Sequence, residues 1–156
     1  MDSIERDIIK NSEYIIEYYK QKGRQLTNLE LQKLAYFLEA IYMVCTDEQY
    51  LFEEEFSAWN FGPVNIEIYH HYKMFGRIPI ELDHEVNINP INLKFIEILF
   101  DLFHEFNATQ LVNLSHSKQS PWYKIYKDCN GKIPRDKMIS KKETKVWFAT
   151  LVEKKI

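Results

Sequence analysis

The sequence predicts a single compact domain that is mainly α-helical and has a short two- or three-stranded sheet near residues 50 to 90. The first observation is that, at three places ahead of a helical apolar pattern, Thr, Asn or Ser is followed three residues later by Glu or Gln, which is the form of a capping box. These pairs are Thr27–Glu30, Asn107–Gln110 and Ser140–Glu143. After each pair, apolar residues recur at threes and fours, the spacing of a helix face. We therefore expect about six or seven helices around a small sheet.

Length and composition are those of one globular domain covering residues 1–156. Of the 156 residues, 46% are hydrophobic and 28% are charged. No apolar run approaches the roughly 20 residues that cross a membrane, and the N-terminus is acidic where a signal peptide is basic. We therefore expect a cytoplasmic protein with no membrane partner. The net charge of −3 argues against a nucleic-acid partner, because nonspecific DNA binding depends on clustered Lys and Arg.

The first two helices are predicted from their ends. The first is expected to begin at a cap provided by Asp2 or Ser3 and to end at Gly23, since glycine tolerates the left-handed backbone that follows a helix. The second is expected to begin at Thr27. Its predicted core face consists of Leu31, Leu34, Ala35, Leu38, Ile41, Tyr42 and Cys45.

One region of the sequence has the pattern of a strand. Apolar and polar residues alternate between Gln49 and Trp59, where the more apolar set is expected to face the core. The natural partners for this strand are residues 77–80 or 84–88, which would complete a small sheet.

The segment after this strand contains a Gly-Pro turn. Gly62 is expected to have a positive φ or to lie close to another backbone. Pro63 suits a helix entry, because the first turn of a helix leaves its N–H groups unpaired. The next helix is predicted over residues 65–75 and ends at Gly76, and residues 83–90 are expected to be a loop.

Four further helices are predicted in the second half of the chain. Asn92 is expected to cap a helix that is apolar on nearly every side and is therefore central to the fold. Asn107 begins a short helix that reaches about residue 116. Pro121 opens another short helix, and Ser140 caps the last one.

No group of residues in the sequence has the pattern of a catalytic or metal site. The nucleotide-binding and nucleophile motifs GxGxxG, GxxxxGK[ST] and GxSxG are missing. His70 and His71 are adjacent, so on a helix they point about 100° apart and cannot share a metal ion on one face. Residues 53–55, all Glu, are interpreted as an exposed acidic edge. We therefore expect no enzymatic activity, no cofactor and no metal.

Aromatic side chains are the remaining signal for function. The chain has 10 Tyr, 10 Phe and 3 Trp, and most of them are expected in the core. Trp59, Tyr69, Tyr72 and Trp122 are candidates for partner contacts, because Trp and Tyr are enriched in binding hot spots; the alternative for each is a purely structural role. Candidate basic patches for an acidic partner are Lys20, Lys22 and Arg24, and the better cluster of Lys132, Arg135, Lys137, Lys141 and Lys142.

Several segments in a fixed order resemble a known family. They are LTNLELQKLAYF at residues 26–37, FSAWNFGPV at residues 56–64, LVNLSH at residues 111–116, and Pro121-Trp122. Their order and spacing resemble the Panacea domain of SocA-like antitoxins, whose pattern is approximately LTNLKLQKLLYF, FxAWxYGPV, LTH and PW. The resemblance covers about residues 5 to 150. The chain departs from the pattern at Ser115, where threonine is usual, and at Phe61, where tyrosine is commoner.

The resemblance implies a function in protein binding. Family members act as antitoxins that hold a protein toxin by direct, chaperone-like contact, and the SocA-type member is an adaptor that hands its toxin to a Clp-type protease. We therefore expect a type II antitoxin with a protein toxin encoded beside it. A protease adaptor, or a phage-encoded protein-interaction or DNA-binding regulatory module, is the alternative. The family-motif or partner-binding candidates are Trp59, Gly62, Pro63, Val64, Tyr69, Tyr72, His116, Pro121 and Trp122.

Overall fold

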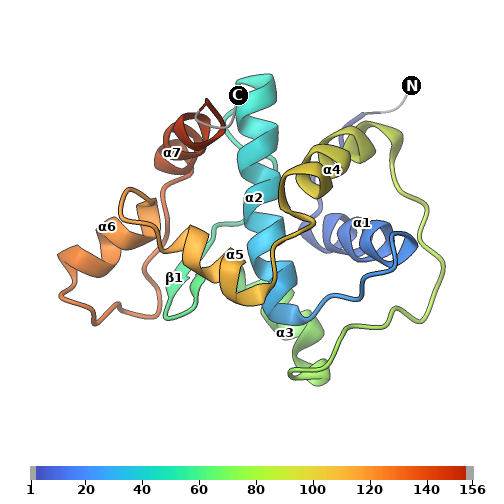
Figure 1. Cartoon of the computed structure of the whole chain (residues 1–156), viewed down its shortest axis with the longest axis horizontal. Coiled ribbons are helices and arrows are strands. Elements are labelled where there is room, and N and C mark those ends of the chain that lie inside the picture. The colour runs from blue at the N-terminus through green and yellow to red at the C-terminus, as the bar shows by residue number, and fades with distance from the viewer. Residues whose placement is uncertain (1–2, 154–156) are drawn as a thin grey trace.

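The computed structural model describes residues 3–153, which form seven α-helices and one two-stranded antiparallel sheet (Figure 1). The predicted fold class, mainly α-helical with a small sheet, is confirmed. No helix in this range is long and apolar enough to span a bilayer. The elements are α1 (Ile8–Gln21), α2 (Asn28–Thr46), β1 (Ser57–Trp59), β2 (Gly62–Val64), α3 (Ile66–Tyr72), the 3₁₀ turn η1 (Lys73–Phe75), α4 (Pro90–Phe103), α5 (Ala108–Ser115), α6 (Pro121–Asp128) and α7 (Lys141–Glu153).

Helix α2 is the centre of the fold. In Figure 1 it stands between α1 and α4 on one side and α5, α6 and α7 on the other, and all of these except α6 pack on it directly. Every residue from 31 to 43 is buried. The expectation that the helix after Asn92 is central is wrong, because α4 buries only the stripe formed by Asn92, Ile96, Leu99 and Phe103.

Side-chain caps fix where several helices begin. Thr27 and Asn107 each form the predicted capping box, with both reciprocal bonds present. The Ser140 hydroxyl accepts a hydrogen bond from the backbone N–H of Glu143 at 3.1 Å, and Pro121 opens α6 as predicted. The helix starts at Thr27 and Asn107 could be predicted from the sequence, because a capping box involves only residues three positions apart.

The start of α1 differs from the prediction. The helix begins after Asp7, whose carboxylate accepts a hydrogen bond from the N–H of Lys10, and not after Ser3. The alternative cap, Asp2, lies outside the described residues. Gly23 follows the end of the helix with a φ of +85°, as expected.

The start of α4 is also earlier than predicted. Asn89 caps this helix, and Pro90 takes its first position, where a missing N–H costs nothing. Asn92 is buried within the first turn instead. Its amide group donates to the carbonyl oxygen of Glu5 at 2.9 Å and to Oδ1 of Asn11 at 2.7 Å. Asn92 therefore joins α4 to the N-terminal segment.

The sheet is a hairpin formed by β1 and β2. Trp59 lies opposite Gly62, so the chain turns at residues 60–61. Pro63 lies within β2, and the expectation that it begins a helix is wrong, because Asn65 caps α3. Proline fits a strand that donates no hydrogen bond at that position.

The predicted partners of the first strand are also wrong. Residues 77–80 and 84–88 contain no strand. The segment that lies along the other edge of β1 is residues 137–139, and the N–H of Ala58 donates to the carbonyl oxygen of Lys137 at 2.8 Å. This pairing joins parts of the chain that lie far apart in sequence.

Residues 76–89 form a long connection that runs past α1 to reach α4 (Figure 1). The N–H of Ile80 donates to the carbonyl oxygen of Leu26 at 2.8 Å, and the Ile80 side chain is buried. The imidazole of His84 contacts the carboxylate of Glu13 on α1. The connection is therefore attached to the body of the protein although it has no regular structure.

Candidate partner-binding site

The motif segments of the sequence meet around Lys33, a fully buried residue of α2. Its Nζ donates a hydrogen bond to the carbonyl oxygen of Pro63 at 2.9 Å. Burial lowers the pKa of Lys33 to about 7, because the ammonium group loses its hydration. The hydrogen bond ties strand β2 to the centre of the fold.

The neighbouring residue, Gln32, holds the end of the hairpin. Its Oε1 accepts from the N–H of Asn65 at 2.8 Å, and its Nε2 donates to the carbonyl oxygen of Asn65 at 3.2 Å. The Asn65 side chain in turn accepts from the N–H of Ile68 at 3.0 Å and caps α3. Consecutive residues of α2 thus fix both β2 and the start of α3.

Gly62 brings the hairpin against the end of α5. Its φ is +103°, and a β-carbon at this position would lie 2.5 Å from Oγ of Ser115 and 3.1 Å from Cε of Lys33. The predicted positive φ is therefore confirmed, and the close neighbours are side chains rather than backbone. Any side chain at this position would both strain the backbone and displace its neighbours.

His116 and Trp122 are stacked on each other. Their ring centroids are 3.6 Å apart with an interplanar angle of 8°, and Nε1 of Trp122 donates to the carbonyl oxygen of Trp59 at 2.6 Å. Nε2 of His116 is buried without a hydrogen-bond partner among residues 3–153. Burial, and then the nearby charge of Lys33, lower the pKa of His116 to about 4. The imidazole is therefore neutral at neutral pH.

We expect acid to destabilise the protein through His116. The folded state keeps the ring neutral down to a pKa of about 4, whereas the unfolded chain takes up a proton below the ordinary value of 6.5. Since the unfolded state then binds more protons, the stability present above pH 6.5 is lost as the pH falls toward 4. His116→Phe keeps a ring on Trp122 and removes this titration. As the pH falls from about 7 to about 5, the free energy of unfolding of His116→Phe should increase by about 1 kcal/mol relative to that of wild type. We keep this value small because the ring is partly exposed.

Urea unfolding of both proteins at the two pH values measures this difference. If the gap between His116→Phe and wild type stays constant with pH, the protonation of His116 is not linked to folding.

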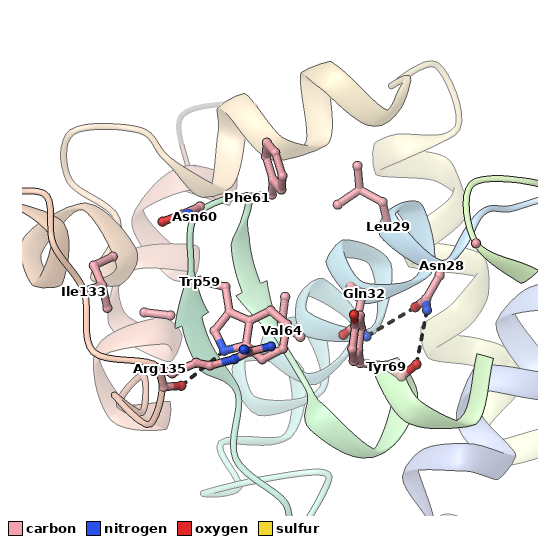
Figure 2. A pocket seen from close by; sticks show the side chains of 12 residues that line it. Asn28, Leu29, Gln32, Trp59, Asn60, Phe61, Val64, Tyr69, Ile133 and Arg135 are labelled. Atoms are coloured by element: carbon pink, nitrogen blue, oxygen red, sulfur yellow. Dashed lines mark hydrogen bonds between the residues drawn. The ribbon is translucent and has the colours of Figure 1, made fainter. Parts of the chain in front are cut away.

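A groove with a volume of about 500 Å³ opens beside this cluster. We call it the hairpin groove. Figure 2 shows Phe61 and Leu29 at its upper edge in that view, above Trp59, Val64 and Gln32. The lining residues come from α2, the hairpin, α3, the residue after η1 and the segment before α7: Asn28, Leu29, Gln32, Ala58, Trp59, Asn60, Phe61, Val64, Tyr69, Gly76, Ile133 and Arg135.

Trp59 anchors one side of the hairpin groove. Its ring lies edge-on to Tyr69, with centroids 5.2 Å apart, and the guanidinium carbon of Arg135 lies 4.7 Å from its centroid. Nε1 of Trp59 donates to the backbone carbonyl of Arg135 at 3.2 Å (Figure 2). A second cation, Nζ of Lys73, lies 6.0 Å from the centroid of Tyr69. Of the three aromatic residues that line the groove, Trp59 and Tyr69 thus each have a cation over the ring.

Most of the predicted site residues meet around the hairpin, although sequence reasoning missed two of their central neighbours. Those that meet are Trp59, Gly62, Pro63, Val64, Tyr69, His116 and Trp122. Pro121 opens α6 beside Trp122 and does not line the groove. Tyr72 does not join them, because it is buried in the hydrophobic core. Trp122 is also buried, and its visible roles are to pack against His116 and to donate to the carbonyl oxygen of Trp59. The two neighbours missed are Gln32 and Lys33, and the LQKL motif that contains them was the available signal.

The predicted C-terminal basic patch is smaller than expected, because Lys141 is engaged inside the protein. Its Nζ lies 2.8 Å from both carboxylate oxygens of Glu39 and 2.8 Å from the carbonyl oxygen of Glu54. The members of the patch that are exposed are Lys132, Arg135, Lys137 and Lys142. In the N-terminal patch, Arg24 pairs with Glu30 at 2.6 Å.

The other reactive side chains are dispersed over the structure. Among residues 3–153, no three His, Cys, Asp or Glu side chains are placed to hold a metal ion together. Cys45 and Cys129 are free thiols. His70 and His71 lie exposed on α3.

The family comparison matches the elements that surround Lys33. The family described as antitoxin SocA-like, Panacea domain, matches residues 31–123, more than half of the chain. The chain belongs to this family. The matched part of the Panacea domain runs from α2 through the hairpin to the first turn of α6, and the resemblance seen in the sequence motifs is thereby confirmed. No curated protein and no solved structure matches the chain.

Proposed function

We propose that this Panacea-domain protein is the antitoxin of a type II toxin–antitoxin system, and that it neutralises a protein toxin by stoichiometric binding. The observation that carries the proposal is the family match over residues 31–123. In this proposal the protein needs no catalytic step and no cofactor, because binding alone inactivates the toxin. The expected toxin is the product of the neighbouring gene.

The arrangement of α2 favours protein binding over the DNA-binding alternative. The segment that comes nearest to a recognition helix is the start of α2, where every residue from 31 to 43 is buried by neighbouring elements. A recognition helix needs an exposed face that enters the major groove. The hairpin groove, in contrast, exposes aromatic and apolar side chains of the kind found in protein interfaces.

Co-expression with the neighbouring gene tests the proposal. The neighbouring product alone should arrest growth, and co-expression of this protein should restore it. The two chains should also co-purify in a fixed ratio that does not change with expression level. A harmless neighbouring product, or rescue without a complex, would refute neutralisation by binding.

The protease-adaptor alternative predicts a different fate for the toxin. An adaptor lowers the amount of toxin, and its rescue disappears in a host that lacks the Clp-type protease. Neutralisation by binding leaves the toxin intact in the complex and does not depend on the protease. Immunoblots of the toxin in the two hosts, with and without this protein, separate the two mechanisms.

A further inference from the structure

We propose that the hairpin groove is the surface that holds the toxin, and that its occupant is a segment of the toxin in which a bulky apolar side chain lies beside a carboxylate. This inference rests on the proposed antitoxin function and adds the site and the chemistry of the segment it binds. Three features of the groove support it: an exposed aromatic tip, a preformed floor and an uncompensated positive charge.

The tip of the hairpin exposes an aromatic side chain where a polar residue is usual. Phe61 occupies the second position of a two-residue turn, and 66% of its surface is exposed. Turns at this position favour Gly, Asn or Asp. The fold leaves most of this ring in contact with solvent, and the ring stands over a groove whose floor contains Trp59 and Val64. This placement suits a bulky apolar side chain inserted between the ring and the floor.

The floor of the groove is held in place before any partner arrives. Lys33 fixes the carbonyl of Pro63, Gln32 fixes the backbone of Asn65, and Trp122 fixes the carbonyl of Trp59. A preformed surface loses little conformational entropy on binding. The first two bonds also engage backbone groups of β2 and of the residue after it, so the partner is not expected to bind as an added strand.

The positive charges around the groove indicate that the bound segment carries an acidic residue next to its apolar side chain. Arg135 lines the groove and Lys73 lies over the ring of Tyr69, which also lines it. None of the described residues that line the groove carries a carboxylate. The acidic residues nearest in sequence to Lys73 and Arg135 are Glu67 and Asp136, and neither lines the groove. The two cations are therefore available to a carboxylate of the partner, which should speed association by electrostatic steering.

Two groove variants test the inference against the purified product of the neighbouring gene. Phe61→Ala removes the aromatic tip and should weaken binding by about 10- to 100-fold. Arg135→Glu reverses the charge but keeps the backbone carbonyl that bonds Trp59, and it should slow association by about tenfold or more at low salt. Both side chains are exposed, so the urea midpoint of Phe61→Ala should match wild type. The midpoint of Arg135→Glu should fall only slightly, because this variant loses the contact of the guanidinium group with the ring of Trp59.

Matched controls come from another face of the protein. Val146→Ala removes an apolar side chain that is 62% exposed on α7, and Lys94→Glu reverses an exposed charge on α4 that belongs to neither basic patch. Neither residue lines the hairpin groove. Both controls should bind the toxin within about twofold of wild type, because surface residues outside an interface contribute little.

The outcomes separate this inference from the antitoxin proposal. If wild type does not bind the neighbouring product, the antitoxin proposal fails. If wild type binds and Phe61→Ala and Arg135→Glu bind equally well, the groove is not the site. Overlapping peptides from the toxin, titrated against wild type, should bind only where an aromatic or aliphatic residue adjoins Asp or Glu. Binding confined to basic peptides, or self-association of wild type that Phe61→Ala abolishes, would overturn the assigned occupant.

Discussion

Replacing Lys141 by Met is expected to lower the free energy of unfolding by about 3 to 5 kcal/mol, among the largest effects of any single substitution in this protein. Lys141 is the cation that neutralises Glu39, whose side chain is only 3% exposed. Methionine keeps much of the apolar stem but leaves a buried carboxylate without its partner. It also removes the donor to the carbonyl of Glu54.

The surrounding hydrogen bonds explain why this loss cannot be absorbed easily. Oε2 of Glu39 accepts from the N–H groups of Leu51 and Phe52 at 3.1 and 2.9 Å. Glu39 on α2 and Lys141 on α7 therefore hold the connection that leads from α2 to the hairpin. Losing the cation therefore loosens the attachment of α2, α7 and this connection to one another.

Two measurements distinguish this mechanism from a general loss of packing. Lys142→Met, one residue along and exposed, should change stability by no more than about 0.5 kcal/mol. Burial already raises the pKa of Glu39 against the opposing effect of Lys141. Without Lys141 that pKa rises further, so the folded variant binds an extra proton and recovers stability relative to wild type as the pH falls. A deficit that does not change with pH would show that Glu39 is not responsible.

Local signals in the sequence predicted several helix starts correctly. The boxes at Thr27 and Asn107 need only residues three apart, and both were confirmed. The start of α4 was missed because Asn89 and Asn92 are both plausible caps. The contacts of Asn92 with Glu5 and Asn11, both far away in sequence, remove it from that role.

The core of the site could not be derived from helical periodicity. The apolar spacing of α2 places Gln32 and Lys33 outside its predicted core face, where a polar residue normally meets solvent. In the fold the hairpin covers that side of α2, so both side chains are buried and bond its backbone. The family motif pointed to these positions, but it carried no information on which groups they bind.

The hairpin shows that the sequence pattern also does not reveal which segments pair in a sheet. Alternation predicted a strand between Gln49 and Trp59, but only Ser57–Trp59 form one, and the pattern contains no information on its partner. The true partner, β2, contains a glycine and a proline, both poor strand residues by propensity. Contacts with α2 and α5 override that propensity.

Gly62→Ala is expected to lower the free energy of unfolding by about 2 to 5 kcal/mol, the sum of backbone strain and overpacking. Alanine at a φ of +103° is strained, and its β-carbon would lie 2.5 Å from Oγ of Ser115. Gly62→Val should be at least as harmful. Denaturant midpoints measured at neutral pH give the size of the loss.

Gly23 provides the control that separates strain from crowding at Gly62. Its φ of +85° is also positive, but a β-carbon there would have no neighbour within 4 Å. Gly23→Ala should therefore show only the cost of strain, about 1 kcal/mol. Ser115→Ala should rescue part of the loss in Gly62→Ala, with a coupling of about 0.5 kcal/mol or more in a double-mutant cycle. Equal losses at the two glycines, or additivity with Ser115→Ala, would mean that the hairpin shifts away from α5 at little cost.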